Sequence, residues 1–143
     1  MLIIAPMLPE HPKFLALQEA QEFAALWIAK DEYCDGLAKA GPAYSAIADG
    51  VVVGCGGVVT KHDSVGVAWA LFSSMAGPHM MRITRETRRF FDALDYRRIE
   101  TAVERSHGIG HRWANALGFQ QEGIMRAYLP DGRDAVLYSI VRE

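Results

Sequence analysis

The sequence predicts a mixed α/β fold in a single domain of 143 residues, with helices on both faces of the sheet and the element order β-α-α-β-β-β-α-β-α-β-β. Three observations predict this class. Apolar runs flank Asp49-Gly50, a pair typical of two-residue hairpins. An amphipathic helix is expected between strands 65–72 and 97–104, which indicates a right-handed crossover and parallel pairing. Two more strands follow a helix that ends at Gly118, a typical helix stop.

The first half of the chain is expected to contain one strand, two helical pieces and an antiparallel meander. Residues 2–5 are predicted as the strand, and residues 13–30 as a helix with one apolar stripe. A second helical piece is expected to reach Ala40. The hairpin arms are residues 43–48 and 51–60. The second arm carries three glycines, which suggests a bulge or a close approach of two backbones.

The second half is expected to alternate helices and strands. Residues 79–94 are predicted as a helix with an apolar inner stripe and a basic outer face. Residues 97–104 alternate apolar and polar side chains, which is typical of a strand. Ser106 is expected to cap the next helix. Strands 120–129 and 134–141 then form a closing hairpin around a Pro-Asp-Gly turn.

Composition favours a soluble protein of a reducing compartment. Half of the residues are apolar, 22 % are charged, and the net charge of −2 argues against a general binder of nucleic acid or membrane surfaces. Cys34 and Cys55 are too few for a disulfide scaffold. The start, MLIIAPMLPE, lacks a basic leader and is not expected to be a signal peptide. No run approaches the ~20 apolar residues of a membrane span. A cytoplasmic location is therefore expected.

The last third of the chain carries a family resemblance. The stretch HRWANALGFQQEGIMRAYLPDGRDAVLYSIVRE is similar to the ending of the GNAT superfamily of acetyltransferases, and the element order is also that of the superfamily. In particular, it resembles the members that acetylate protein N-termini. The recurring residues are Glu122-Gly123, Arg126, Tyr128, Gly132-Arg133 and Leu137-Tyr138.

The resemblance implies a splayed sheet that admits acetyl-CoA between strands 65–73 and 97–104. The leading function that it implies is transfer of an acetyl group to a primary amine of unknown identity. The residues implied to contact the cofactor are Ala70, Leu71, Phe72 and Ser73 for the pantetheine arm, Gly77 and His79 for the pyrophosphate, and His107 at the start of the next helix. Arg82, on the basic helix face, could reach a phosphate of the cofactor, but the alternative that we favour is a solvated face partly offset by Glu86 and Asp92.

The phosphate loop departs from the superfamily pattern, Gln/Arg-x-x-Gly-x-Gly/Ala. Residues 74–79 read Ser-Met-Ala-Gly-Pro-His, and Gly77 alone agrees. Pro78 removes one backbone donor, and His79 places a side chain where small residues let phosphate approach. His107 stands where many members have an asparagine, and Ala114 stands where many have a tyrosine acid. The loop is therefore degenerate.

Three side chains are candidates for catalysis. Glu100 or Glu104 could deprotonate the incoming amine, which must be neutral to attack a thioester. The alternative, which we favour, is that both carboxylates are solvated or paired with neighbouring arginines. Tyr128 could donate to the leaving thiolate or could be a surface aromatic. His107 and His111 have a helical metal-ligand spacing, but the sequence offers no third ligand, so no metal site is expected.

A second resemblance concerns short GNAT-like proteins encoded among the virion genes of tailed phages. These proteins share the degenerate loop, and residues 69–74 are similar to their Trp-x-x-x-Ser/Thr-Ser strand. This resemblance implies an alternative function, a non-catalytic structural or assembly protein with virion proteins as partners and a location in the particle. The sequence does not decide whether the chain forms a homo-oligomer. Nucleic-acid binding through the basic helix has little support.

Overall fold

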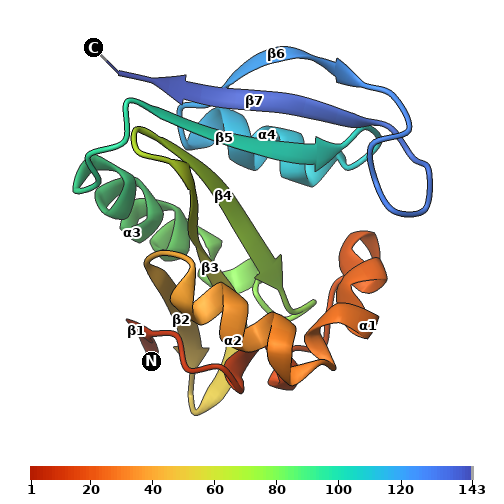
Figure 1. Ribbon diagram of the computed structural model, residues 1–143. Helices are drawn as coiled ribbons and strands as arrows, with labels where there is room; N and C mark the ends of the chain where they lie inside the picture. The colour runs from red at the N-terminus through yellow and green to blue at the C-terminus, as the bar shows by residue number, and fades with distance from the viewer. Residues whose placement is uncertain (143) are drawn as a thin grey trace. The chain divides into compact units, whose positions relative to one another are not determined.

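The computed structural model describes residues 1–142, except for the side chains of Ala20 and Phe23. Figure 1 shows its elements. The strands are β1 (Leu2–Pro6), β2 (Ala43–Ala48), β3 (Val51–His62), β4 (Val65–Phe72), β5 (Arg98–Glu104), β6 (Gln120–Met125) and β7 (Ala135–Val141). The α-helices are α1 (Ala25–Ile28), α2 (Asp31–Lys39), α3 (Met80–Asp92) and α4 (Gly108–Ala116), and the 3-10 helices are η1 (His11–Phe14), η2 (Glu19–Ala24) and η3 (Gly77–His79).

The strands form a mixed seven-stranded sheet in the order β1-β2-β3-β4-β5-β7-β6. β4 and β5 are parallel, as the helical crossover between them predicts. The pairs β1–β2, β2–β3, β5–β7 and β6–β7 are antiparallel. The predicted fold class and the order of strands and helices are confirmed. Among the described residues, no helix is long and apolar enough to cross a membrane.

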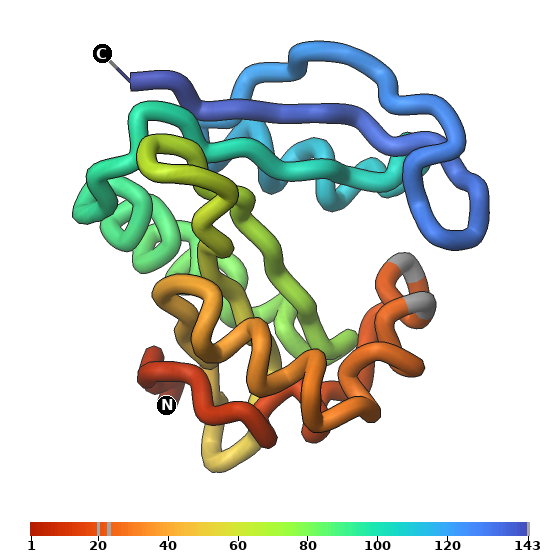
Figure 2. Tube along the Cα trace, in the orientation of Figure 1, coloured from red at the N-terminus to blue at the C-terminus, as the bar shows by residue number. Residues whose placement is uncertain are grey.

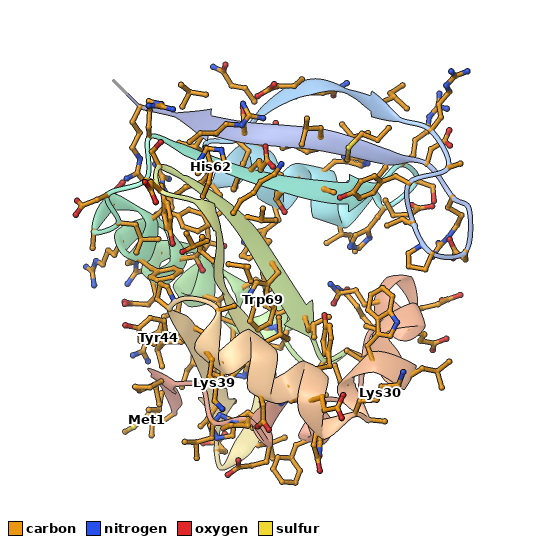
Figure 3. All side chains as sticks on the ribbon, viewed as in Figure 1. Met1, Lys30, Lys39, Tyr44, His62 and Trp69 are labelled. Atoms are coloured by element: carbon orange, nitrogen blue, oxygen red, sulfur yellow. The ribbon has the colours of Figure 1, made fainter. Side chains whose placement is uncertain are left out.

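Contacts divide the chain into two compact units. The first contains residues 1–59 and 68–86, and the second contains residues 60–67 and 87–143. The core of the first unit consists of Met7, Leu15, Ala24, Ile28, Cys34, Val52, Cys55 and Leu71. Trp69 of β4, labelled in Figure 3, packs against this core.

The segment between β1 and α2 differs from the single helix expected over residues 13–30. It consists of the short helices η1, η2 and α1 instead. The chain is extended at Leu15 and again at Gln18, and Leu17 forms an isolated antiparallel bridge with Ser73 at the end of β4. The pairing of this backbone with β4 therefore prevents the continuous helix that the apolar periodicity predicts. Two positions of that periodicity, Ala20 and Phe23, have side chains outside the described part of the chain.

The hairpin between β2 and β3 has the predicted turn. Asp49 and Gly50 have φ values of 49° and 82°, the left-handed pair that a type I′ turn requires. The predicted irregularity is also present, because the register shifts between Ala46 and Ile47. A Cβ on Gly57 would lie 2.5 Å from a backbone oxygen of the neighbouring segment, so only glycine is accommodated there.

The second unit is built on the β5–β7 ladder, which runs in register from Arg98↔Val141 to Glu104↔Ala135. Ile99 is fully buried on β5, and Phe91 of α3 meets Phe119 edge to face with ring centroids 5.7 Å apart. Gly118 ends α4 at φ 97° as predicted. Two details differ from the prediction. His107 rather than Ser106 precedes the first turn of α4, and β6 ends at Met125.

Candidate functional site

The edge of β4 that faces away from β3 is the implied place for a cofactor arm. The Ser73 amide donates to the Val53 carbonyl on β3 at 2.9 Å. Backbone groups alternate in direction along a strand, so those of Ala70 and Phe72 point to the opposite edge. The parallel ladder with β5 involves Val65–Val67 of β4.

A glutamine side chain pairs with this edge. The Nε2 of Gln21, on η2, donates to the Ala70 carbonyl at 2.8 Å, and the Phe72 amide donates to its Oε1 at 2.8 Å. The Nε2 of Gln18 donates to the same Oε1 at 3.0 Å. One carboxamide therefore satisfies both an acceptor and a donor of β4.

The backbone that precedes Gln21 follows the same edge. The Gln18 amide donates to the Phe72 carbonyl at 3.0 Å, and the Ser74 amide donates to the Ala16 carbonyl at 3.0 Å. Figure 2 shows this red-orange segment beside the green end of β4. Residues 16–21 form a strap that covers the last residues of β4, and the name "strap" is kept for them below.

The residues expected to bind pantetheine are thus already paired within the protein. The carbonyl of Ala70 and both backbone groups of Phe72 bond to the strap. Leu71 has a buried side chain, and the hydroxyl of Ser73 accepts a bond from the Met75 amide at 3.1 Å. The GNAT resemblance implies that a pantetheine arm pairs with this strand edge through its amide groups, and the bonds to the strap leave those backbone groups of Ala70 and Phe72 already occupied.

The phosphate loop does not present a ring of free amides. Gly77 and His79 form η3 with Pro78, which has no N–H, and the His79 amide donates to the Ala76 carbonyl at 2.9 Å. The Ala76 amide in turn donates to the Ser73 carbonyl at 3.1 Å. Arg82 donates to the Leu2 carbonyl at 2.5 Å, so this guanidinium anchors β1. These contacts do not favour an anion site.

Glu100 and Glu104 are both tied to cations or donors. Glu100 accepts from Lys61 at 2.7 Å and from Arg98 at 2.9 Å, and the bond from Lys61, ahead of that from Arg98, lowers its pKa. Glu104 accepts from the amide and hydroxyl of Ser106, and the hydroxyl bond lowers its pKa most. A general base works best with a pKa near the operating pH, so these shifts make both carboxylates weaker bases.

The remaining candidates lie at the surface or in structural contacts. Tyr128 has 57 % of its surface exposed. His107 immediately precedes α4, and burial lowers its pKa. His111 Nε2 donates to the Arg105 carbonyl at 2.8 Å, so in the neutral imidazole Nδ1 is the acceptor and Tyr138 donates to it at 2.7 Å. Within the described residues, no three side chains are grouped to hold a metal ion.

Gln21 is the residue that sequence reasoning missed. A glutamine in a polar stretch is usually solvated, and nothing local indicates a bond to a residue about fifty positions away. The departures of residues 74–79 from the superfamily pattern are the nearest signal in the sequence of this contact. They indicate that the cofactor edge of β4 need not stay open for a ligand.

The fold that these elements define is that of the GNAT acetyltransferases, and solved structures show the same arrangement. A GNAT-family acetyltransferase from Streptococcus pneumoniae is 12 % identical with a TM-score of 0.72, and the match covers 100 % of both chains. A ribosomal-protein-S5-alanine acetyltransferase from Vibrio fischeri is 16 % identical with a TM-score of 0.73, over 99 % of this chain and 93 % of the other.

An IAA acetyltransferase from Bacillus cereus is 15 % identical with a TM-score of 0.65, over 99 % of each chain. No protein-family model matches the sequence, and no curated protein sequence gives a significant match. At these identities the likeness is one of fold.

Proposed function

We propose that this chain uses the GNAT fold without acetyl transfer, as a structural or assembly protein. The observation that carries the proposal is the pairing of the Ala70 and Phe72 backbone groups with the strap. The setting comes from the sequence resemblance to proteins encoded among tailed-phage virion genes. That resemblance makes virion proteins the proposed partners and the phage particle the proposed location.

Two further observations support a non-catalytic role. Pro78 and the local bonds of the phosphate loop leave few backbone donors for a pyrophosphate. Glu100 and Glu104 have lowered pKa values because of their bonds to Lys61 and Ser106. Neither carboxylate has the raised pKa that suits a general base at neutral pH.

Calorimetric and thermal-shift titrations of the purified chain with acetyl-CoA test the proposal. We expect no heat of binding and no rise in melting temperature up to millimolar ligand, because a ligand that binds the native state must stabilise it. An equal concentration of ADP controls for weak nucleotide binding. A saturable shift with acetyl-CoA that ADP does not reproduce would overturn the proposal.

Acetyl-CoA-dependent transfer to a primary amine is the second candidate. The parallel pairing of β4 with β5 over Val65–Val67, as the GNAT resemblance implies, favours it. It would keep the roles expected for Glu100, Glu104 and Tyr128, and it would require the strap to leave β4. Incubation with acetyl-CoA and a mixture of peptides with free N-termini, read by mass spectrometry, separates the two candidates. Acetylated peptides would establish this second function.

A further inference from the structure

We infer that Gln21 blocks the edge of β4 and call it the stopper. Its carboxamide hydrogen-bonds to the Ala70 carbonyl and the Phe72 amide, which an extended, amide-bearing ligand such as a pantetheine arm would need. The inference deepens the proposed function and rests on it, because it names the side chain that closes the site. It also predicts that a latent ligand edge lies beneath the strap.

The first argument is the match between a carboxamide and a peptide unit. A parallel neighbouring strand satisfies an edge by offering the N–H and C=O of one residue to two residues that are two positions apart. Gln21 offers the same two groups to Ala70 and Phe72, both at 2.8 Å. The side chain therefore replaces one residue of a missing strand.

The second argument is that the carboxamide is held in one orientation. Gln18 Nε2 donates to Gln21 Oε1 at 3.0 Å, which directs the oxygen toward the Phe72 amide. The reversed orientation would set the Gln21 amino group against two other donors. Gln18 thus fixes the side chain that pairs with β4.

The third argument is that the Gln21 backbone is used elsewhere. Its amide donates to the Gln18 carbonyl at 2.9 Å, within the turn that begins η2. The main chain at this point cannot pair with β4 as a strand would. The long side chain supplies the reach, which a shorter residue at this position would lack.

The stopper and a pantetheine arm would compete for the same groups. A ligand that needs the edge open binds with an apparent affinity reduced by the fraction of molecules in which the edge is open. Removal of the carboxamide takes away two of the hydrogen bonds that hold the strap on β4, and the loss of these bonds raises that fraction. The wild-type chain and a Gln21 variant should therefore differ in ligand affinity even when both are folded.

Three variants test the inference: Gln21→Ala, the similarly long Gln21→Met, and the control Glu22→Ala at an exposed neighbouring position. Hydrogen exchange by NMR reports on the Phe72 amide. We expect exchange to become roughly tenfold faster in both Gln21 variants and to stay unchanged in Glu22→Ala, because one hydrogen bond is lost. Circular dichroism establishes that each variant is folded, and Gln21→Met keeps the test valid if the alanine variant is not.

The same variants are titrated with acetyl-CoA. We expect the Gln21 variants to bind at least about tenfold more tightly than the wild type and Glu22→Ala. Unchanged exchange at Phe72, or equal affinity in all four proteins, would overturn the inference. The proposed function fails separately, if the wild type itself binds acetyl-CoA, so the two failures are distinguishable.

Discussion

Glu100 shows how a single residue on β5 links charge to stability. Its bond to Lys61, followed by that to Arg98, holds its pKa below the ordinary value. A carboxyl whose pKa is lower in the folded state contributes stability above its unfolded pKa of about 4.3, and this contribution is lost as the pH falls through the folded pKa. We expect the free energy of unfolding of Glu100→Gln to fall less than that of the wild type as the pH drops below ~4.3. Urea unfolding at neutral and acid pH measures this difference.

Glu22→Gln, at an exposed position on η2, is the matched control. It should retain the acid dependence of the wild type. A Glu100→Gln protein with the same acid dependence as the wild type would show that the Lys61 and Arg98 contacts contribute nothing measurable.

Tyr138 provides a second residue-scale prediction. Its side chain is buried on β7, and its hydroxyl donates to His111 Nδ1 at 2.7 Å. Tyr138→Phe leaves that nitrogen without its donor and should lower the free energy of unfolding by about 1 kcal/mol. Tyr128→Phe, at an exposed position, should stay within roughly 0.5 kcal/mol of the wild type. Equal effects of the two changes in urea unfolding would contradict the assigned hydrogen bond.

Two glycines in different elements should respond in opposite ways to alanine. A Cβ at Gly57 of β3 would lie 2.5 Å from the Pro42 oxygen, whereas a Cβ at Gly36 of α2 would meet nothing within 4 Å. Gly57→Ala should destabilise the protein by roughly 2 kcal/mol or more, because backbone atoms must move. Gly36→Ala should stabilise it by about 0.5–1 kcal/mol, since alanine favours a helix interior.

Thermal unfolding of both variants measures these effects. If Gly57→Ala were as stable as the wild type, the two backbones would have room to separate, and the close approach would not be a constraint on the sequence.

Local signals account for the elements that the sequence predicts well. The Asp49-Gly50 turn, the Gly118 stop and the helical crossover depend on nearby residues or on handedness rules, and all three are present. The single helix expected over residues 13–30 is replaced by three short helices, because the pairing of Leu17 with Ser73 overrides local periodicity.

The contacts of the candidate site were harder to predict for the same reason. Glu100 was expected to pair with nearby arginines, and Arg98 does bond to it, but Lys61 comes from a distant strand. The contact of Gln21 with β4 joins residues about fifty positions apart, and no spacing rule connects them.

At the scale of the whole chain, three elements cross between the two compact units. β3, β4 and α3 each contribute residues to both units. Neither unit is therefore a continuous piece of chain, and we expect both to unfold in one cooperative transition. Trp27 and Trp69 report on the first unit and Trp113 on the second.

Chemical denaturation of a Trp113→Phe protein, followed by tryptophan fluorescence, should coincide with the far-ultraviolet circular dichroism of the same protein. Midpoints that differ would show that the units unfold independently and would contradict the expected cooperativity.

The strap has a consequence for the evolution of related sequences. If a carboxamide closes the β4 edge, as inferred for Gln21, the chain no longer needs glycines that admit a phosphate, and we expect chains that keep those glycines to lack the carboxamide. Across homologues, a glutamine aligned with Gln21 and a glycine-rich loop aligned with residues 74–79 should exclude one another. These two features of an alignment would then distinguish chains of this fold that do not bind acetyl-CoA from chains that do.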